Sequence, residues 1–370
     1  MADAQLNLEY RKEVLSRFFE LIHSGESFYV IGAPSVGKTR LMDFLLGDNV
    51  DAASKDPFDR HAVKKHYLGE VQASATWLVR VDLNRLSQEH DWSFHFYELL
   101  LSSVLFACSK HPETGSVKEI ETMLADLDSR VIQSKDTLMA HRLFEMAMNT
   151  ICQSYRLKLC FLFDEFDEPY KKMPREIFAQ LRAVRDANKY RLFYVLFLRN
   201  LPETLRKPTE NESFYELISR NLVGIGPYTR LDALQIIQHL ERRKNFSLTQ
   251  EKREWLFLMS GGHPGLLIAL FGTLSQQTLP ISEPSWYFKQ ESVAEEFRKI
   301  WNGLTEEEKD GLLAFSRGDL AHILPAARKI LTAKGLLRPD GRDLTPFSPL
   351  LPLFLAAQTT QTPPPKKVQS

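Results

Sequence analysis

The sequence predicts an α/β protein in which a parallel sheet is followed by a helical lid and a C-terminal winged-helix domain. Strand-like apolar runs alternate with helical segments over the first 200 residues, which is typical of a parallel sheet. These runs are apolar at consecutive positions, as in "FLF" at 161–163, and this pattern fits a sheet covered by helices on both faces. Residues 296–355 differ, with short helical segments and a turn-rich end.

The individual elements follow from hydrophobic periodicity. Residues 6–25 have apolar side chains at helical spacing and precede the first strand. The polar stretch 109–136 contains a helical segment that we expect to be exposed. Thr229 is expected to cap the helix that follows it. The expected strands are 27–31, 76–83, 157–163 and 191–200, and the other expected helices are 92–107, 137–155, 177–190, 231–246 and 251–259.

The composition is that of an ordinary globular protein, with 44% hydrophobic and 25% charged residues in 370. Lysine plus arginine equals aspartate plus glutamate, 47 against 47, which argues against a broadly basic nucleic-acid protein but allows a local basic patch. The three cysteines lack metal-type spacing, and no apolar run is long enough to span a membrane. We therefore expect a cytoplasmic protein with no membrane partner, ending in a disordered proline-rich tail.

The stretch "SFYVIGAPSVGKTRLMDFLL" joins an apolar strand, a glycine loop and an apolar helix. This is the context that a phosphate-binding P-loop (Walker A) requires, because backbone N–H groups and the helix N-terminus face the phosphates. We expect Lys38 to be largely exposed and to reach the β- and γ-phosphates, and the Thr39 hydroxyl to bind Mg²⁺. The expected nucleotide-binding residues are Gly32, Ala33, Pro34, Ser35, Val36, Gly37, Lys38, Thr39 and Arg40.

Four carboxylates follow the buried run in "FLFDEFDE" at 161–168, where like charges need a compensating cation. Asp164 is the expected Mg²⁺ carboxylate (Walker B), directly or through water, and Glu165 is the expected base or orienter of the attacking water. We expect Asp167 and Glu168 to lie in a solvated turn. Arg199 ends the last apolar strand, and since ligands lie at the carboxyl ends of parallel strands, we expect it near the γ-phosphate.

The C-terminal part contains "EFRKIWNGL", "TEEEKDGLLAFSRG" and "LPAARKILTAKGLL", which read as three short helices. Thr305 and Glu308 form an expected capping box, and "RPDGRDLTPFSPL" reads as a β-hairpin with an Asp-Gly turn. This order suggests a winged-helix domain, whose surface either contacts DNA or is a solvated packing face. The candidate DNA-contacting residues are Arg328, Lys329, Lys334, Arg338 and Arg342.

Over residues 1–355 the chain resembles AAA+-related STAND ATPases, the short prokaryotic kind with a nucleotide domain, lid and winged helix. The stretches that carry the resemblance are "GAPSVGKT", "FLFDEFDE", "YVLFLRN", "GIGPYTRLDA" and "SGGHPGLL". The resemblance implies that Arg199 senses the γ-phosphate and that Pro264 lies by the adenine, with Gly262 and His263 beside it. It also implies that Arg220 acts on the nucleotide of a neighbouring subunit.

We therefore expect a P-loop ATPase domain at 1–227, a lid at 228–295, a winged helix at 296–356 and a tail at 357–370. One reading is a slowly hydrolysing ATP/ADP switch that controls self-assembly or a partner protein. The resemblance suggests that such a switch works in bacterial signalling or defence. The alternative is a DNA-associated AAA+ ATPase that resembles an origin initiator or a transposition regulator. A third reading, a degenerate nucleotide-binding scaffold, conflicts with the intact Lys38, Thr39, Asp164 and Glu165.

Overall fold

The computed structural model describes residues 8–47, 62–86, 92–111, 115–275, 283–341 and 343–361. The chain divides into two compact units. The sheet unit comprises residues 12–31 and 39–223, and the C-terminal unit comprises 8–11, the loop 32–38 and the described residues from 224 onward. Within the described residues no helix is both long and apolar enough to cross a membrane.

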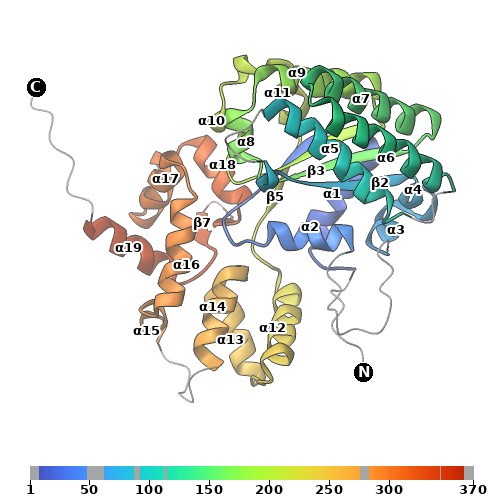
Figure 1. Cartoon of the computed structure of the whole chain (residues 1–370). Helices are drawn as coiled ribbons and strands as arrows, with labels where there is room; N and C mark the ends of the chain where they lie inside the picture. Colours follow the sequence, from blue (N-terminus) through green and yellow to red (C-terminus); the bar gives the residue numbers. More distant parts are fainter. Residues whose placement is uncertain are drawn as a thin grey trace, which may run out of the picture. The chain divides into compact units, whose positions relative to one another are not determined.

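Five strands form one sheet in the order β2-β3-β4-β1-β5, and the pairs β2–β3, β3–β4 and β4–β1 are parallel (Figure 1). The strands β3 and β4 are buried along nearly their whole length, as their uninterrupted apolar sequence predicts. The short β5 was missed by periodicity because it has only four residues. The bounds are β1 Phe28–Gly32, β2 Thr76–Asp82, β3 Lys158–Asp164, β4 Leu192–Leu198 and β5 Leu222–Ile225.

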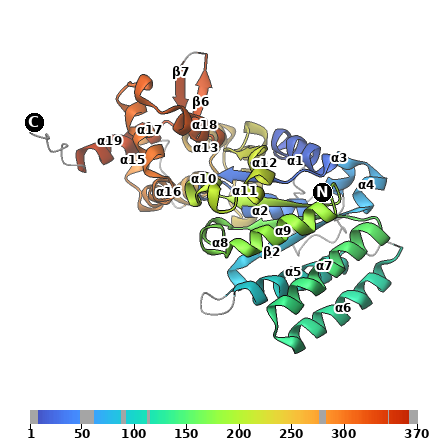
Figure 2. The same cartoon turned by 90° about the horizontal axis from the view of Figure 1, so that it is seen from above.

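Helices cover both faces of this sheet, as Figures 1 and 2 show. The segments α1 Lys12–Ser24 and α2 Lys38–Leu46 lie on one face, and α5 Trp92–Cys108, α7 Thr137–Asn149 and α9 Arg175–Ala187 lie on the other. This division follows from right-handed crossovers between parallel strands. The remaining elements of the unit are α3 Ala62–Leu68, α4 Glu70–Ser74, α6 Val117–Ser134, α8 Asp167–Lys172, α10 Pro202–Leu205 and α11 Glu212–Ser219, with a π-helical turn Thr150–Ser154 after α7.

Aromatic side chains fill the core between the sheet and α5, α7 and α9. Phe161 and Phe163 of β3 stack with centroids 6.2 Å apart, and Tyr194 of β4 lies 6.1 Å from Phe161. The Tyr194 hydroxyl donates to the Leu181 carbonyl of α9 at 2.8 Å, so this buried polar group is satisfied. The core therefore holds the carboxyl ends of β3 and β4 in place, where Asp164 and Arg199 lie.

The C-terminal unit is largely helical. The helices α12 Arg230–Lys244, α13 Gln250–Ser260 and α14 Pro264–Ser275 follow β5, and Thr229 caps α12 as predicted, its hydroxyl accepting from the Asp232 N–H. The predicted capping box of Thr305 and Glu308 is also present. The remaining elements are α15 Pro284–Phe288, α16 Glu291–Asn302, α17 Glu306–Ser316, α18 Pro325–Ala333, the antiparallel pair β6 Leu337–Asp340 and β7 Asp343–Pro346, and α19 Leu351–Gln361.

Three expectations about these elements need correction. The first helix begins at Lys12, not at residue 6. The helix α6 is not simply exposed, since Ile120, Leu124 and its other apolar residues at helical spacing are buried. Asp340 pairs with Asp343 in the hairpin, so the turn begins at Gly341 (φ 60°) and is not an Asp-Gly turn. The predicted domain boundaries stay a prediction.

Candidate functional site

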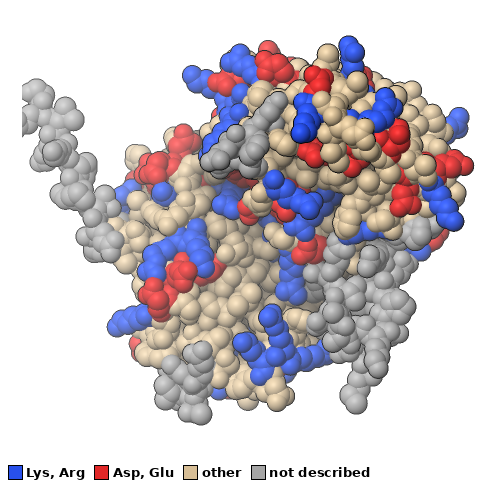
Figure 3. Space-filling model, viewed as in Figure 1, with Lys and Arg blue, Asp and Glu red and all other residues tan. Residues whose placement is uncertain are grey.

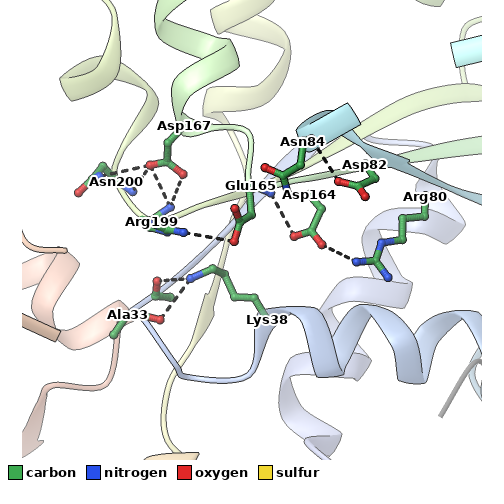
Figure 4. Close-up of polar contacts among 11 residues, drawn as sticks. Ala33, Lys38, Arg80, Asp82, Asn84, Asp164, Glu165, Asp167, Arg199 and Asn200 are labelled. Atoms are coloured by element: carbon green, nitrogen blue, oxygen red, sulfur yellow. Dashed lines mark hydrogen bonds and ion pairs between the residues drawn. The ribbon is translucent and has the colours of Figure 1, made fainter. Parts of the chain in front are cut away.

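The loop 32–38 has the backbone of a phosphate cradle. Ser35 and Gly37 have φ values of 56° and 91°, the left-handed conformation that anion-binding loops use to turn successive N–H groups toward a ligand. A side chain at Gly32 would lie only 2.7 Å from Val36 Cγ1. The Lys38 amine donates to the carbonyls of Gly32 (2.7 Å) and Ala33 (3.2 Å), as Figure 4 shows. Lys38 is thus half-buried and held in the loop, not largely exposed as expected.

Two segments of the C-terminal unit pack against Pro34 of this loop. His263 Nε2 lies 3.2 Å from the Pro34 carbonyl oxygen. A Cβ at Gly303, which follows α16, would lie 2.3 Å from Pro34 Cγ. Pro264 is buried and its Cγ would be 3.7 Å from a Cβ at Gly37. The "GGHP" turn therefore packs against the P-loop within this unit, and α16 adds a second contact; the position of Pro264 by the adenine stays a prediction.

His263 is a neutral, fully buried histidine. A carbonyl only accepts hydrogen bonds, so Nε2 carries the proton that goes to Pro34, and Nδ1 accepts from the Leu266 N–H at 3.5 Å. Burial lowers the pKa of His263 to about 3, although the bond to Pro34 opposes this shift. The side chain therefore joins the start of α14 to the P-loop without carrying charge.

Arg11 ties the N-terminal segment to the same loop. Its Nη2 donates to the Val36 carbonyl and its Nη1 to the Gly226 carbonyl, both at 2.7 Å, and its guanidinium lies 4.5 Å from the Tyr228 ring centroid. The Arg11 N–H donates to buried Asp232 at 3.1 Å. The sequence analysis assigned no role to Arg11, so these links are a structural finding.

In the sheet unit, Asp164 is held from a neighbouring strand. The Arg80 guanidinium of β2 donates to Asp164 Oδ2 at 2.9 Å, as Figure 4 shows. It also donates to Asp43 Oδ1 of α2 at 2.9 Å. Asp164 Oδ1 accepts from the Glu165 N–H at 3.1 Å. Burial raises the pKa of Asp164, and the Arg80 charge opposes that rise. Sequence reasoning missed Arg80, although one cation in the apolar run "TWLVRVDL" was a signal.

Glu165 and Arg199 form a second pair at the same end of the sheet. Arg199 Nη2 lies 3.2 Å from Glu165 Oε1, and Figure 4 shows the two side chains pointing toward each other. Both are nearly half exposed, at 47% and 45% of the side chain. Glu165 has a φ of 49°, a left-handed conformation that non-glycine residues adopt at a cost. The predicted acid pair and strand-end arginine therefore lie together.

Asp167 is not in a solvated turn. Asp167 is the first residue of α8. Its carboxylate accepts hydrogen bonds from the backbone N–H of Arg199 (2.9 Å) and of Asn200 (3.1 Å). It therefore fixes the end of β4 against the start of α8, a structural role that the sequence pattern did not indicate. Glu168 is exposed and pairs with Lys171 at 2.8 Å on the same helix.

The remaining predicted residues differ in accessibility. Arg220 is exposed at the end of α11. Of the basic candidates for DNA, Arg328 and Lys329 are exposed on α18, but Lys334 is fully buried and paired with Glu308 at 2.5 Å. The Arg338 guanidinium donates to the Gly261 carbonyl, and burial lowers its pKa. Lys334 is therefore removed from the candidate DNA surface, and Arg342 lies outside the described residues.

The residues present fit a magnesium nucleotide by their chemistry. A threonine hydroxyl and one carboxylate are hard oxygen ligands, and Mg²⁺ bound with phosphates needs only one or two protein ligands. No group of three or more His, Cys, Asp or Glu side chains that could hold a metal ion occurs in the described part of the chain. The Arg80 guanidinium already forms an ion pair with Asp164. Of the other predicted loop residues, Thr39 is exposed and Arg40 is half-buried.

No protein-family model matches the chain, and no curated protein does. A Walker-type ATPase of Pyrococcus abyssi is 15% identical, with a TM-score of 0.52 over 94% of this chain and 95% of that one. The Aeropyrum pernix ORC2 protein in its ADP form is 13% identical over 97% and 96% (TM-score 0.48). The ORC1 protein of the same organism, in complex with DNA, is 13% identical over 94% and 92% (TM-score 0.42).

The first of these likenesses is informative about architecture, because it extends over nearly the whole of both chains. The parallel sheet, the glycine loop between β1 and α2, and the helical region after β5 are all as the sequence predicts. The chain therefore has a P-loop α/β fold with a helical C-terminal region, similar in fold to that Walker-type ATPase.

Proposed function

We propose that the protein is a Mg²⁺-dependent ATPase that works as a nucleotide-controlled switch. The observation that carries this proposal is the intact set of groups: the cradle at 32–38, Asp164 and Glu165 after β3, and Arg199 after β4. The Walker-type ATPase of Pyrococcus abyssi, which has a similar fold, supports it.

Each residue has a role that its environment supports. The Lys38 ammonium, already bonded to loop carbonyls, binds the phosphate oxygens, and Arg199 adds a planar guanidinium for the γ-phosphate. Thr39 and Asp164 would hold the magnesium ion, which neutralises phosphate charge when bound. The Glu165 carboxylate orients a water molecule and accepts its proton. Slow turnover, which the resemblance to STAND switches implies, is part of this proposal.

The switch part of the proposal comes from Pro34. A P-loop that changes shape with its nucleotide moves Pro34, and Pro34 contacts His263 before α14 and Gly303 after α16. Further along, the Arg338 and Ser348 side chains donate to the carbonyls of Gly261 and Met259 next to the same turn. The loop is therefore connected to the C-terminal hairpin through a short series of contacts.

Gly303→Ala tests this connection. Its φ is not left-handed, so alanine is tolerated by the backbone, but the new methyl group meets the rigid Pro34 ring. We expect weaker ATP binding and altered hydrolysis with a folded protein. Gly272→Ala on α14 is the matched control, since a Cβ there meets nothing within 4 Å. Equal nucleotide affinity in both variants, measured by calorimetry, would reject the proposed connection between the P-loop and α16. If the unaltered protein does not hydrolyse ATP in the presence of Mg²⁺, the proposed ATPase activity is rejected.

For the output of the switch we favour DNA over a partner protein, because α18 exposes Arg328 and Lys329 side by side. A second basic group lies at the end of α12, where Figure 3 shows blue side chains gathered and where Arg242, Arg243 and Lys244 form the last turn.

Fluorescence anisotropy with duplex DNA at several salt concentrations separates these surfaces. Arg328→Ala with Lys329→Ala should weaken binding and reduce the slope of log affinity against log salt by about 2, one for each phosphate contact. The matched variant Arg242→Ala with Arg243→Ala removes the same charge from α12. Equal losses in both pairs would mean non-specific attraction, and no DNA binding at all would leave the partner-protein output.

A further inference from the structure

Arg80 is the one basic residue of β2, and the residues around it in this strand are mostly apolar. Trp77, Leu78, Val79 and Val81 are buried, whereas the Arg80 side chain is 32% exposed and extends to two carboxylates. Its Nη1 reaches Asp43 Oδ1 and its Nη2 reaches Asp164 Oδ2, both at 2.9 Å. Its Nε has no hydrogen-bond partner among the described residues. The guanidinium is therefore held by its two carboxylates.

The location of Asp164 explains why a cation is needed there. The Asp164 side chain is only 7% exposed. Asp82 is opposite Asp164 in the register of β2 and β3, so the adjacent parallel strand also ends in an acidic residue. A buried carboxylate without a partner is strongly destabilising. Arg80, opposite Leu162 and two residues earlier in β2, provides the charge from the same face of the sheet.

The ion pair between Arg80 and Asp164 would compete with a metal ion for the Asp164 carboxylate. One Asp164 oxygen accepts from the Glu165 N–H, which is fixed by the backbone, and the other accepts from Arg80. A magnesium ion, or a water bound to it, needs one of these oxygens. The long, flexible arginine is the partner that can leave, and Asp43 on α2 can retain it. Asp43 is four residues after Thr39, on the same side of that helix.

We propose that Arg80 is a positioning residue that occupies Asp164 until magnesium nucleotide binds, and that Asp43 then holds the released guanidinium alone. This inference rests on the proposed function. Arg80 and Asp43 would thereby set the magnesium concentration at which the nucleotide is bound, in opposite directions. Loss of Arg80 removes the competitor for Asp164. Loss of the Asp43 charge removes the alternative partner and leaves Arg80 on Asp164.

The test measures binding of a fluorescent ADP analogue during titration with Mg²⁺, so it needs no turnover. Arg80→Gln should lower the Mg²⁺ concentration for half-maximal binding by on the order of tenfold, which corresponds to about 1.4 kcal/mol. Asp43→Asn should raise it, and the double variant should behave like Arg80→Gln. Arg182→Gln is the matched control, because it breaks a similar arginine–aspartate pair with Asp186 on the distant surface of α9.

A brace that only stabilises the fold gives a different result. If Arg80 merely joins α2 to β3, both single variants weaken binding in the same direction, and the proposal is overturned while the proposed ATPase stands. If the unaltered protein shows no Mg²⁺-dependent nucleotide binding, both the proposed role of Arg80 and the proposed ATPase are rejected. Should Arg80→Gln not fold, Arg80→Lys keeps the charge but loses the two-armed geometry, and an unchanged or higher Mg²⁺ requirement in it contradicts the proposal.

Discussion

Arg199 Nη2 lies 3.2 Å from Glu165 Oε1, so the residue after β4 holds the residue after β3. The pair is half exposed and contributes little to stability. Its consequence is functional, because a phosphate group and the Glu165 carboxylate are both anions and compete for one guanidinium. Binding of a γ-phosphate to Arg199 would therefore release Glu165 to act on water.

Glu165→Gln should keep magnesium-nucleotide binding and lose turnover. Glutamine preserves size and hydrogen bonding but cannot accept a proton, and general-base catalysis is worth about 10²-fold or more in rate. A phosphate-release assay and nucleotide-binding calorimetry measure the two effects separately. Asp164→Asn is the comparison and should weaken the Mg²⁺ dependence of binding. Hydrolysis by Glu165→Gln at the rate of the unaltered protein would move the base role elsewhere.

Lys38→Ala should abolish nucleotide binding and leave the protein folded. The variant removes the charge that stabilises the phosphates and two hydrogen bonds to loop carbonyls. The stability cost should be about 1–3 kcal/mol, since the carbonyls of two buried residues lose a donor. Calorimetry with ATP and thermal unfolding test this, with Lys171→Ala on α8 as an exposed control. Unchanged ATP affinity in Lys38→Ala would refute the assignment of the P-loop.

Arg199 and Arg220 should differ in a mixing experiment. Arg199 lies in the same unit as Asp164, so we expect it to act in its own subunit, whereas exposed Arg220 could act on a neighbour. An arginine finger is worth roughly 10³–10⁵ in rate. Mixing Arg220→Ala with Lys38→Ala should restore activity, because one interface then has an intact P-loop and finger. Mixing Arg199→Ala with Lys38→Ala should not. A fully active Arg220→Ala protein would exclude that role.

The stability of the protein should fall in acid because of His263. Its folded pKa of about 3 lies below its ordinary value of 6.5, so between these values only the unfolded chain binds the proton. The contribution of neutral His263 is complete above pH 6.5 and is lost toward pH 3, at up to about 1.4 kcal/mol per pH unit.

His263→Gln keeps an N–H donor for the Pro34 carbonyl but does not titrate. Its free energy of unfolding should therefore depend less on pH between 6.5 and about 5 than that of the unaltered protein. The measurement is urea unfolding at several pH values. The control is His23→Gln, because the His23 side chain at the end of α1 is exposed. Parallel pH profiles for His263→Gln and the unaltered protein would contradict the assignment of a buried neutral imidazole.

The sequence by itself determined the elements whose signal is local. Apolar runs defined β3 and β4, the glycine loop before Lys38 defined the turn between β1 and α2, and Thr229 and Thr305 defined helix starts. It also placed Asp164 and Arg199 at one edge of the sheet, because carboxyl ends of parallel strands share an edge. The four-residue β5 and the start of α1 escaped prediction, since short elements and boundaries have weak periodicity.

Only the tertiary structure decided which side chains are partners. Arg80 meets Asp164 across 84 positions, and His263 meets Pro34 across 229, distances at which no spacing rule applies. The burial of Lys334 at the end of α18 likewise depends on Glu308 of α17 packing beside it. Such pairs form because a folded core forces each buried charge or polar atom to find a partner, and only the packing of distant segments determines which partner is within reach.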